Sequence, residues 1–172
     1  MDLREKKTKR SIKNAFIQLR AHKPLERISV KELAELAEIS KATFYLHYHD
    51  IYDLSNCLQK EVIRGILNDI PKPELLLSDT PEFTKALFHA FLSQETLIDI
   101  LFSGTQSSIL SDSLEKELKN YIYQIMPKTK QDARLNILLS YQIQGGFHAF
   151  VKNRKEFGTD CIMEVISEIN LI

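Results

Sequence analysis

The sequence predicts an all-α protein, and three observations support that fold class. Glycine and proline together account for 10 of the 172 residues, about half of their average usage, so the tight turns of a many-stranded β fold are scarce. Apolar residues recur at steps of three and four along most of the chain, which is the spacing of amphipathic helices. No segment shows the strict alternation that is typical of a strand, and we expect about nine helices.

The first three predicted helices form a head over residues 1–50. Apolar residues at helical spacing and serine caps place these helices at residues 8–23, 29–37 and 40–48. Ser29 and Glu32 have the spacing of a capping box, in which the serine oxygen accepts an orphan amide hydrogen and the glutamate reaches back to the serine amide. Two short helices that follow a longer one across a tight turn are the pattern of a helix-turn-helix unit.

A body of further helices follows over residues 51–172. Asp50 can cap a long helix of about five turns, which links the head to the body and ends at Pro71. Thr80 and Pro81 have the order expected at a helix start, with proline in the first turn. The apolar stripes place the helices of the body at residues 51–70, 80–92, 93–102, 114–125, 130–153 and 159–172.

Gly145 and Gly146 lie inside the helix predicted at residues 130–153. Each glycine costs a helix about 1 kcal/mol relative to alanine, so the pair calls for an explanation. Close backbone packing at a helix interface is one explanation and room for a ligand is the other. Packing is the favoured interpretation.

Charge is unevenly distributed along the chain although its net value is zero. Residues 1–50 hold 11 Lys/Arg and 7 Asp/Glu, whereas residues 51–172 hold 12 and 16. A basic head on an acidic body indicates that the head binds a polyanion, although a modest excess of this kind also arises by chance. Lysines and arginines at the start of the first helix oppose the helix dipole, and contact with phosphate would explain them.

Other functional classes find little support in the sequence. There is no glycine-rich phosphate loop and no serine nucleophile elbow, so we expect no enzyme activity and no cofactor. His47 and His49 do not share a helix face, and no metal site is expected there. Cys57 and Cys161 form no C-x-x-C pair, which favours a reduced, cytoplasmic protein. No apolar run approaches the ~20 residues of a bilayer span, so no membrane association is expected.

Residues 28–48 carry a pattern that is highly specific. The stretch reads ISVKELAELAEISKATFYLHY and is followed by Asp50 and Leu54. It combines a capping serine, a Leu-Ala pair, an Ile-Ser pair and a Thr-Phe-Tyr-x-His run. In these features the head resembles the tetracycline-repressor (TetR) family of bacterial transcriptional regulators. The body is weakly similar to the variable C-terminal region of one branch of that family, the dihydroxyacetone-kinase-type regulators.

The resemblance implies a role for each matched position of the head. Ser29 would cap the second helix against a phosphate, the start of the third helix would face the major groove, and Tyr45 and His47 would bind the DNA backbone. Phe44 and Tyr48 would be buried, and a basic N-terminal arm would contact phosphates or the minor groove. The implied DNA-binding residues are Lys9, Ser29, Lys41, Ala42, Thr43, Tyr45, His47 and His49.

Two positions depart from the family pattern. Glu38 stands in the turn where the family usually has glycine, and a glutamate at positive φ costs roughly 1 kcal/mol. Ile51 stands where the family usually has lysine, so one phosphate contact is missing. We expect weaker DNA binding and a salt dependence reduced by about one unit of slope, with His49 as a candidate for compensation.

The resulting hypothesis is a homodimeric regulator, most simply a repressor, that binds a palindromic double-stranded DNA operator. The last two helices would pair with their copies in a four-helix bundle. The candidate interface residues are Phe147, Ile162, Val165, Ile166 and Ile169.

Regulation would come from the body, through a small molecule or through a partner protein. A ligand would have to bind the DNA-free state better than the DNA-bound state. An apolar effector is preferred because few charges lie among the aromatic residues of the body. The candidate pocket residues, which plain core packing explains equally well, are Phe88, Phe91, Phe102, Tyr121, Tyr141 and Phe147. If the body instead binds a partner protein, an activator is also possible.

Overall fold

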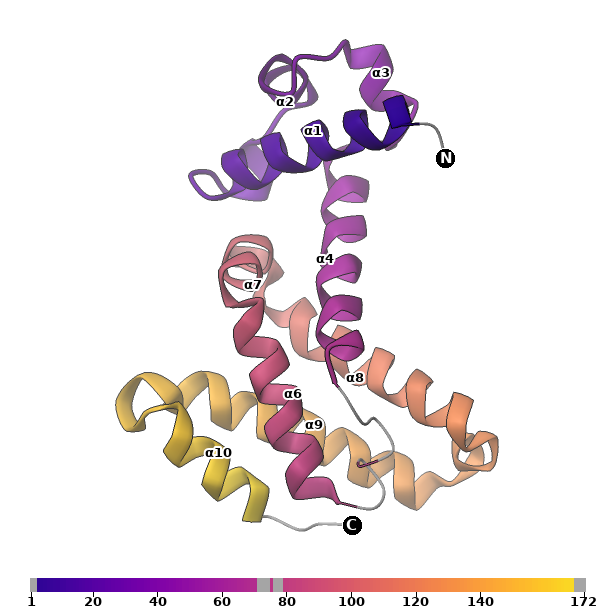
Figure 1. The fold of residues 1–172 in the computed structure, drawn as a ribbon, viewed down its shortest axis with the longest axis vertical. Coiled ribbons are helices and arrows are strands. Elements are labelled where there is room, and N and C mark those ends of the chain that lie inside the picture. Colours follow the sequence, from indigo (N-terminus) through magenta and orange to yellow (C-terminus); the bar gives the residue numbers. More distant parts are fainter. Residues whose placement is uncertain (1–2, 71–74, 76–78, 169–172) are drawn as a thin grey trace. The chain divides into compact units, whose positions relative to one another are not determined.

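A computed structural model describes residues 3–70, 75 and 79–168 of the protein. Nine α-helices and three short 3₁₀ helices make up the regular structure of this part of the chain (Figure 1). No strand occurs in the described ranges. The predicted all-α class with about nine helices is therefore confirmed.

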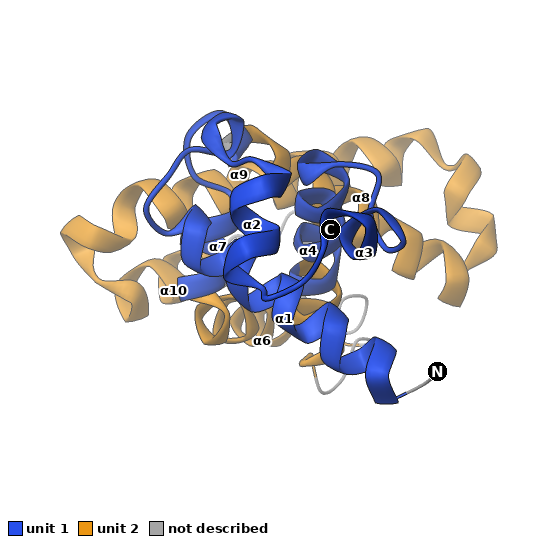
Figure 2. Ribbon diagram, turned by 90° about the horizontal axis from the view of Figure 1, so that it is seen from above, with its two compact units in different colours: residues 1–62, 96–107 blue, residues 63–95, 108–172 orange. Residues whose placement is uncertain are grey.

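The chain divides into two compact units, each built from two stretches of sequence (Figure 2). The first unit comprises Met1–Val62 and Thr96–Ser107, and the second comprises Ile63–Glu95 and Ser108–Ile172. The sequence interpretation divided head from body at residue 50. The first unit extends further because it takes most of the fourth helix and a later segment of chain.

Helix α1 (Leu3–Arg20) begins before the predicted position at Thr8. Its first turns are supported by an ion pair between Lys9 and Glu5 at 2.9 Å and by a hydrogen bond from the Thr8 hydroxyl to the Arg4 carbonyl. The basic residues expected in an N-terminal arm therefore belong to the helix.

Helices α2 (Val30–Leu36) and α3 (Lys41–Tyr45) form the predicted helix-turn-helix pair. Helix α2 packs against both α1 and α3. Helix α3 ends earlier than the predicted Tyr48. The small core beneath these helices is closed by Phe16, Leu33 and Phe44, all fully buried.

Helix α4 (Ile51–Asn68) starts as predicted at an aspartate cap, where the Asp53 amide donates to Asp50 Oδ1 at 2.7 Å. Helix α7 (Glu95–Leu101) and the 3₁₀ helix η2 (Gly104–Gln106) follow much later in the sequence. Apart from Glu95, this later segment is part of the first unit.

Three side chains bind the later segment within the first unit. Arg20, which is buried, donates from Nη2 to the Ser103 carbonyl at 3.1 Å. Gln59, also buried, donates from Nε2 to the Leu101 carbonyl at 3.0 Å. The carboxylate of Glu26, in the 3₁₀ helix η1 (Leu25–Arg27), accepts a 2.6 Å hydrogen bond from a threonine hydroxyl of η2.

The second unit contains α6 (Thr80–Ser93), α8 (Ser107–Ile125), α9 (Ala133–Phe157) and α10 (Thr159–Glu168). Asp79 caps α6, and proline stands in its first turn as predicted. The 3₁₀ helix η3 (Pro127–Gln131) joins α8 to α9. Helix α10 packs against both α6 and α9.

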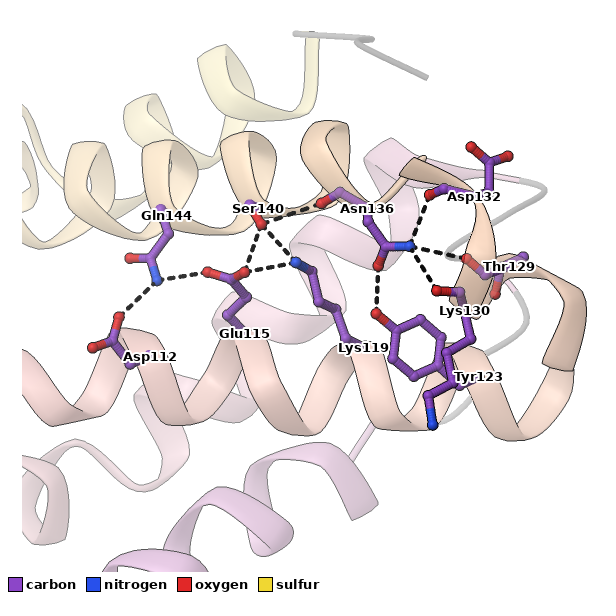
Figure 3. A network of polar contacts seen from close by, with 10 residues as sticks. All are labelled: Asp112, Glu115, Lys119, Tyr123, Thr129, Lys130, Asp132, Asn136, Ser140 and Gln144. Atoms are coloured by element: carbon purple, nitrogen blue, oxygen red, sulfur yellow. Dashed lines mark hydrogen bonds and ion pairs between the residues drawn. The ribbon is translucent and has the colours of Figure 1, made fainter. Parts of the chain in front are cut away.

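A polar network joins α8 to α9 in the second unit (Figure 3). Glu115 on α8 lies at its centre and pairs with Lys119 at 2.8 Å. The same carboxylate accepts hydrogen bonds from Ser140 at 2.6 Å and from Gln144 at 2.8 Å, both on α9. Each contact between the helices requires its two residues to lie on facing turns of α8 and α9. The network therefore fixes how the two helices align along their lengths.

Candidate nucleic-acid interface

The outer face of α3 is formed by residues one turn apart. Lys41, Ala42, Tyr45 and Leu46 are all exposed, and the two last are 57% and 82% exposed. Helical spacing places these residues on one side of α3, because positions i and i+4 share a face. This side offers a cation, a phenol and two apolar groups.

Capping and core packing hold α3 in place. Ser40 Oγ accepts a hydrogen bond from the Thr43 amide at 3.0 Å and lies 2.9 Å from the Thr43 hydroxyl. Phe44 is fully buried and contacts the rings of Tyr45 and Tyr48 at centroid distances of 5.5 and 5.8 Å. The exposed tyrosine is thus attached to a rigid support.

Thr43 and His47 take positions that differ from the sequence interpretation. Both were expected on the exposed side of the helix, but both are only partly exposed. The hydroxyl of Thr43 is shared with Ser40, as above, and the ring of His47 lies 6.4 Å from that of Tyr48. Leu46 occupies the exposed position instead. Its spacing of four residues from Ala42 was the sequence signal that would have found it.

The turn between α2 and α3 has the positive-φ position that the sequence analysis expected at Glu38. Glu38 has φ of +56°. The Glu38 amide donates to the Glu35 carbonyl at 3.2 Å, and the Ile39 amide donates to the Ala34 carbonyl at 3.0 Å. These two bonds form a Schellman motif, in which the left-handed position usually holds glycine. Glutamate therefore carries conformational strain in this turn.

Ser29 caps α2 through a 3.2 Å hydrogen bond from the Glu32 amide to its hydroxyl. The second half of the predicted capping box is replaced, since the Glu32 carboxylate pairs with Lys23. Ser29 is exposed, and its hydroxyl lies at the N-terminus of α2 beside the Glu32 amide. That location is suited to a phosphate oxygen.

The start of α1 adds positive charge near the end of α3. Lys6, Lys7 and Arg10 are exposed, whereas Lys9 is half-buried. The pKa of the Glu5 carboxyl is lowered, chiefly by its hydrogen bond with Lys9 and that residue's charge, and to a lesser degree by His47. Lys9 is thus partly neutralised, and its exposed neighbours are better placed to contact a polyanion.

The residues around the start of α4 complete this part of the unit. His49 is exposed, and its amide donates to Asp53 Oδ2 at 3.0 Å. Ile51, one of the two positions that depart from the family pattern described above, is buried. An apolar residue here supports the core of the first unit and offers no contact to phosphate.

The second unit contains a partly open cavity of about 290 Å³. Its walls come from α6, α8, α9 and α10, and no charged residue lines it. Phe88, Phe91, Tyr141 and Phe147, four of the predicted pocket residues, contribute to the wall. The lining residues with polar side chains are Thr84, Tyr141 and Gln142.

Two predicted pocket residues lie elsewhere. Phe102 is buried in the first unit, because the segment that carries it folds there. Tyr121 is on α8, but the wall on that helix is formed by Leu114, Leu118 and Ile122, which occupy the neighbouring helical positions.

Aromatic packing and the glycine pair shape the cavity. Phe88 stacks on Phe150 at a centroid distance of 4.3 Å, and Phe91 meets Phe147 edge to face at 5.7 Å. Both glycines of α9 line the cavity. A Cβ at Gly146 would meet Ile166 of α10 at 3.7 Å, whereas none of the surroundings would lie within 4 Å of one at Gly145. A Cβ would fit at both positions, in ordinary van der Waals contact at Gly146 and in open space at Gly145, so close packing does not explain the pair.

The predicted dimer residues are divided between the interior and the surface of the second unit. Phe147 and Ile166 line the cavity, and Ile162 is half-buried because α10 packs on α6 and α9 of the same chain. Val165 is exposed. Ile169 lies outside the described residues.

An apolar stripe on α9 was not predicted as a surface. Ile137 and Tyr141 are 69% and 65% exposed, and Val151 is exposed further along the helix. Tyr141 and Val151 lie four and fourteen residues after Ile137, which places them about 40° to either side of it around the helix. A larger exposed apolar surface of this kind is typical of a protein interface.

No helix in the described ranges combines the length and apolar character that a membrane span requires.

Comparisons with known proteins give no relative for this chain. No family model, curated protein or solved structure matches the sequence or the fold.

Proposed function

We propose that the protein is a sequence-specific, DNA-binding transcriptional regulator. The observation that carries this proposal is the helix-turn-helix pair, in which a buried phenylalanine supports a short helix with Lys41 and Tyr45 exposed on its outer side. A helix presented in this way fits the major groove of B-DNA. The family resemblance of residues 28–48 supports the same function.

The regulator acts as a homodimer on a palindromic operator, with half-sites about one helical turn apart. The exposed stripe of Ile137, Tyr141 and Val151 on α9, with Val165 on α10, supports pairing between two copies of the second unit. An isologous contact of this kind gives the two-fold symmetry that a palindrome requires.

The cavity in the second unit is the proposed effector site. A space of about 290 Å³ lined by phenylalanines and leucines, with a few neutral polar groups, suits an uncharged and largely apolar molecule. Binding of the effector releases the repressor from its operator. The effector must have a higher affinity for the DNA-free state, because equal affinity for both states would shift no population.

A partner protein is the alternative input, in which case the regulator can also be an activator. The exposed stripe on α9 would serve such a partner equally well. The cavity favours the small-molecule proposal, because a concave apolar pocket with a few polar groups is the usual form of a small-molecule site.

Fluorescence anisotropy with DNA fragments from upstream of the protein's own gene tests the proposal. We expect tight binding that resists competitor DNA and is lost in Tyr45→Ala. Lys41→Gln should reduce the slope of log K against log salt by about one. Lys85→Gln, an exposed lysine of α6, is the matched control and should leave that slope unchanged.

Weak, salt-labile binding that Tyr45→Ala leaves intact would contradict a DNA-reading role for α3. Light scattering tests the dimer separately, and a single-chain mass at micromolar concentration would refute it. Ile137→Asp should convert the dimer to single chains, whereas Leu36→Asp, a comparable change at an exposed leucine of α2, should not.

A further inference from the structure

Leu46 is an apolar side chain held out from the surface at the end of α3. It is 82% exposed, although full burial of a leucine side chain is worth roughly 1.5–3 kcal/mol. The core of the first unit makes little use of this residue, since Phe44 and the core-facing residues of α1 and α2 fill it. The side chain is therefore available to a binding partner.

Ala42 lies one turn before Leu46 and extends the same apolar surface. The Leu46 amide donates to the Ala42 carbonyl at 3.2 Å, which fixes the two residues on adjacent turns. Both side chains are exposed. Lys41 and Tyr45 lie next to them in the sequence and are exposed as well. The result is a small apolar patch with a cation and a phenol at its edge.

The chemistry of this patch matches one feature of duplex DNA. Leu46 has neither a donor nor an acceptor for a phosphate or a polar base edge. The C5-methyl group of thymine is the apolar group that base pairs present in the major groove, and apolar side chains contact it there. Lys41 and Tyr45 supply the backbone contacts that hold a helix in the groove.

We propose that Leu46, together with Ala42, recognises the methyl group of a thymine in each operator half-site. This inference rests on the proposed DNA-binding function and adds a specificity determinant to it. Replacing thymine by uracil removes only the methyl group from the DNA, so the contact can be tested without altering base pairing.

The test begins with selection of sites from a pool of random duplex DNA by the full-length protein. The selected half-sites should share a fixed thymine. Deoxyuridine at that position should weaken wild-type binding about fourfold, which corresponds to the loss of one buried methylene-sized group. In Leu46→Ala the same DNA substitution should have less than half of this effect. Leu36→Ala, an exposed leucine outside α3, should keep the full wild-type sensitivity.

Two outcomes would overturn the inference and leave the proposed function standing. One is specific DNA binding that tolerates uracil at every thymine of the selected site. The other is an undiminished uracil effect in Leu46→Ala, with circular dichroism showing that the variant is folded. Failure to select any sequence would instead refute DNA recognition as a whole, and would leave an exposed apolar patch for a protein partner.

Discussion

Glu115 provides the sharpest test of the packing between α8 and α9. Burial raises the pKa of this carboxyl, but hydrogen bonds from Lys119, Ser140 and Gln144 and the charge of the lysine outweigh that effect and lower the pKa from 4.5 to about 2. Glu115→Gln keeps the shape and one acceptor oxygen but removes the charge. The variant should therefore be less stable than the wild type at neutral pH.

The size of the effect follows from the pKa. One pKa unit corresponds to about 1.4 kcal/mol, so a pKa lowered from 4.5 to about 2 is worth at most about 3.5 kcal/mol. The side chain is 20% exposed, and solvent screening reduces the expected loss to about 2 kcal/mol. Because the folded-state pKa lies below the unfolded one, the contribution is complete above pH 4.5 and disappears as the pH falls toward 2.

Urea unfolding followed by circular dichroism, at pH 7, 5 and 3, measures the difference between the two proteins. The destabilisation should be largest at the two higher values and clearly smaller at the lowest. Glu156→Gln, an exposed glutamate of α9, is the control and should change the stability by less than about 0.5 kcal/mol. An equal loss at all three pH values would refute the account of the charged network.

Three further changes test other parts of the structure. Glu38→Gly should raise the free energy of unfolding by about 0.5–1 kcal/mol, because glycine relieves the left-handed strain but costs chain entropy; a loss of stability in urea unfolding would contradict the turn geometry. Phe150→Ala should lower the free energy of unfolding by about 3–5 kcal/mol through loss of the stack on Phe88, and near-wild-type unfolding would show that this ring is outside the core. Ser40→Ala should cost about 1 kcal/mol by removing the cap of α3, whereas an unchanged thermal midpoint would show that the cap is dispensable.

The sequence predicted the helices well because their signals are local. Apolar periodicity and caps such as Ser29, Ser40 and Asp50 act within one or two turns, and the structure has a helix start at each of them. Helix ends were less accurate. Helix α3 stops before His47, since the chain must turn to begin α4, and no residue marks that stop in the sequence.

Features that depend on contacts between distant parts of the chain could not be predicted from local sequence patterns. Phe102 has the composition of a pocket residue, but its position depends on where Thr96–Ser107 folds. The predicted capping box at Glu32 is only half formed. The Glu32 carboxylate pairs instead with Lys23, which lies between α1 and η1. The exposed stripe on α9 was also missed, because periodicity alone does not distinguish the buried side of a helix from an exposed apolar one.

The first unit is built from two stretches of chain, and this has a consequence for recombination with other helical proteins. A chimera that takes only residues 1–62 and joins them to a foreign body would lose the carbonyl groups of Leu101 and Ser103. Buried Gln59 and Arg20 would then lack these acceptors, and each unsatisfied group costs about 1–3 kcal/mol. A single crossover cannot transplant the first unit intact, so residues 96–107 must be inherited with residues 1–62.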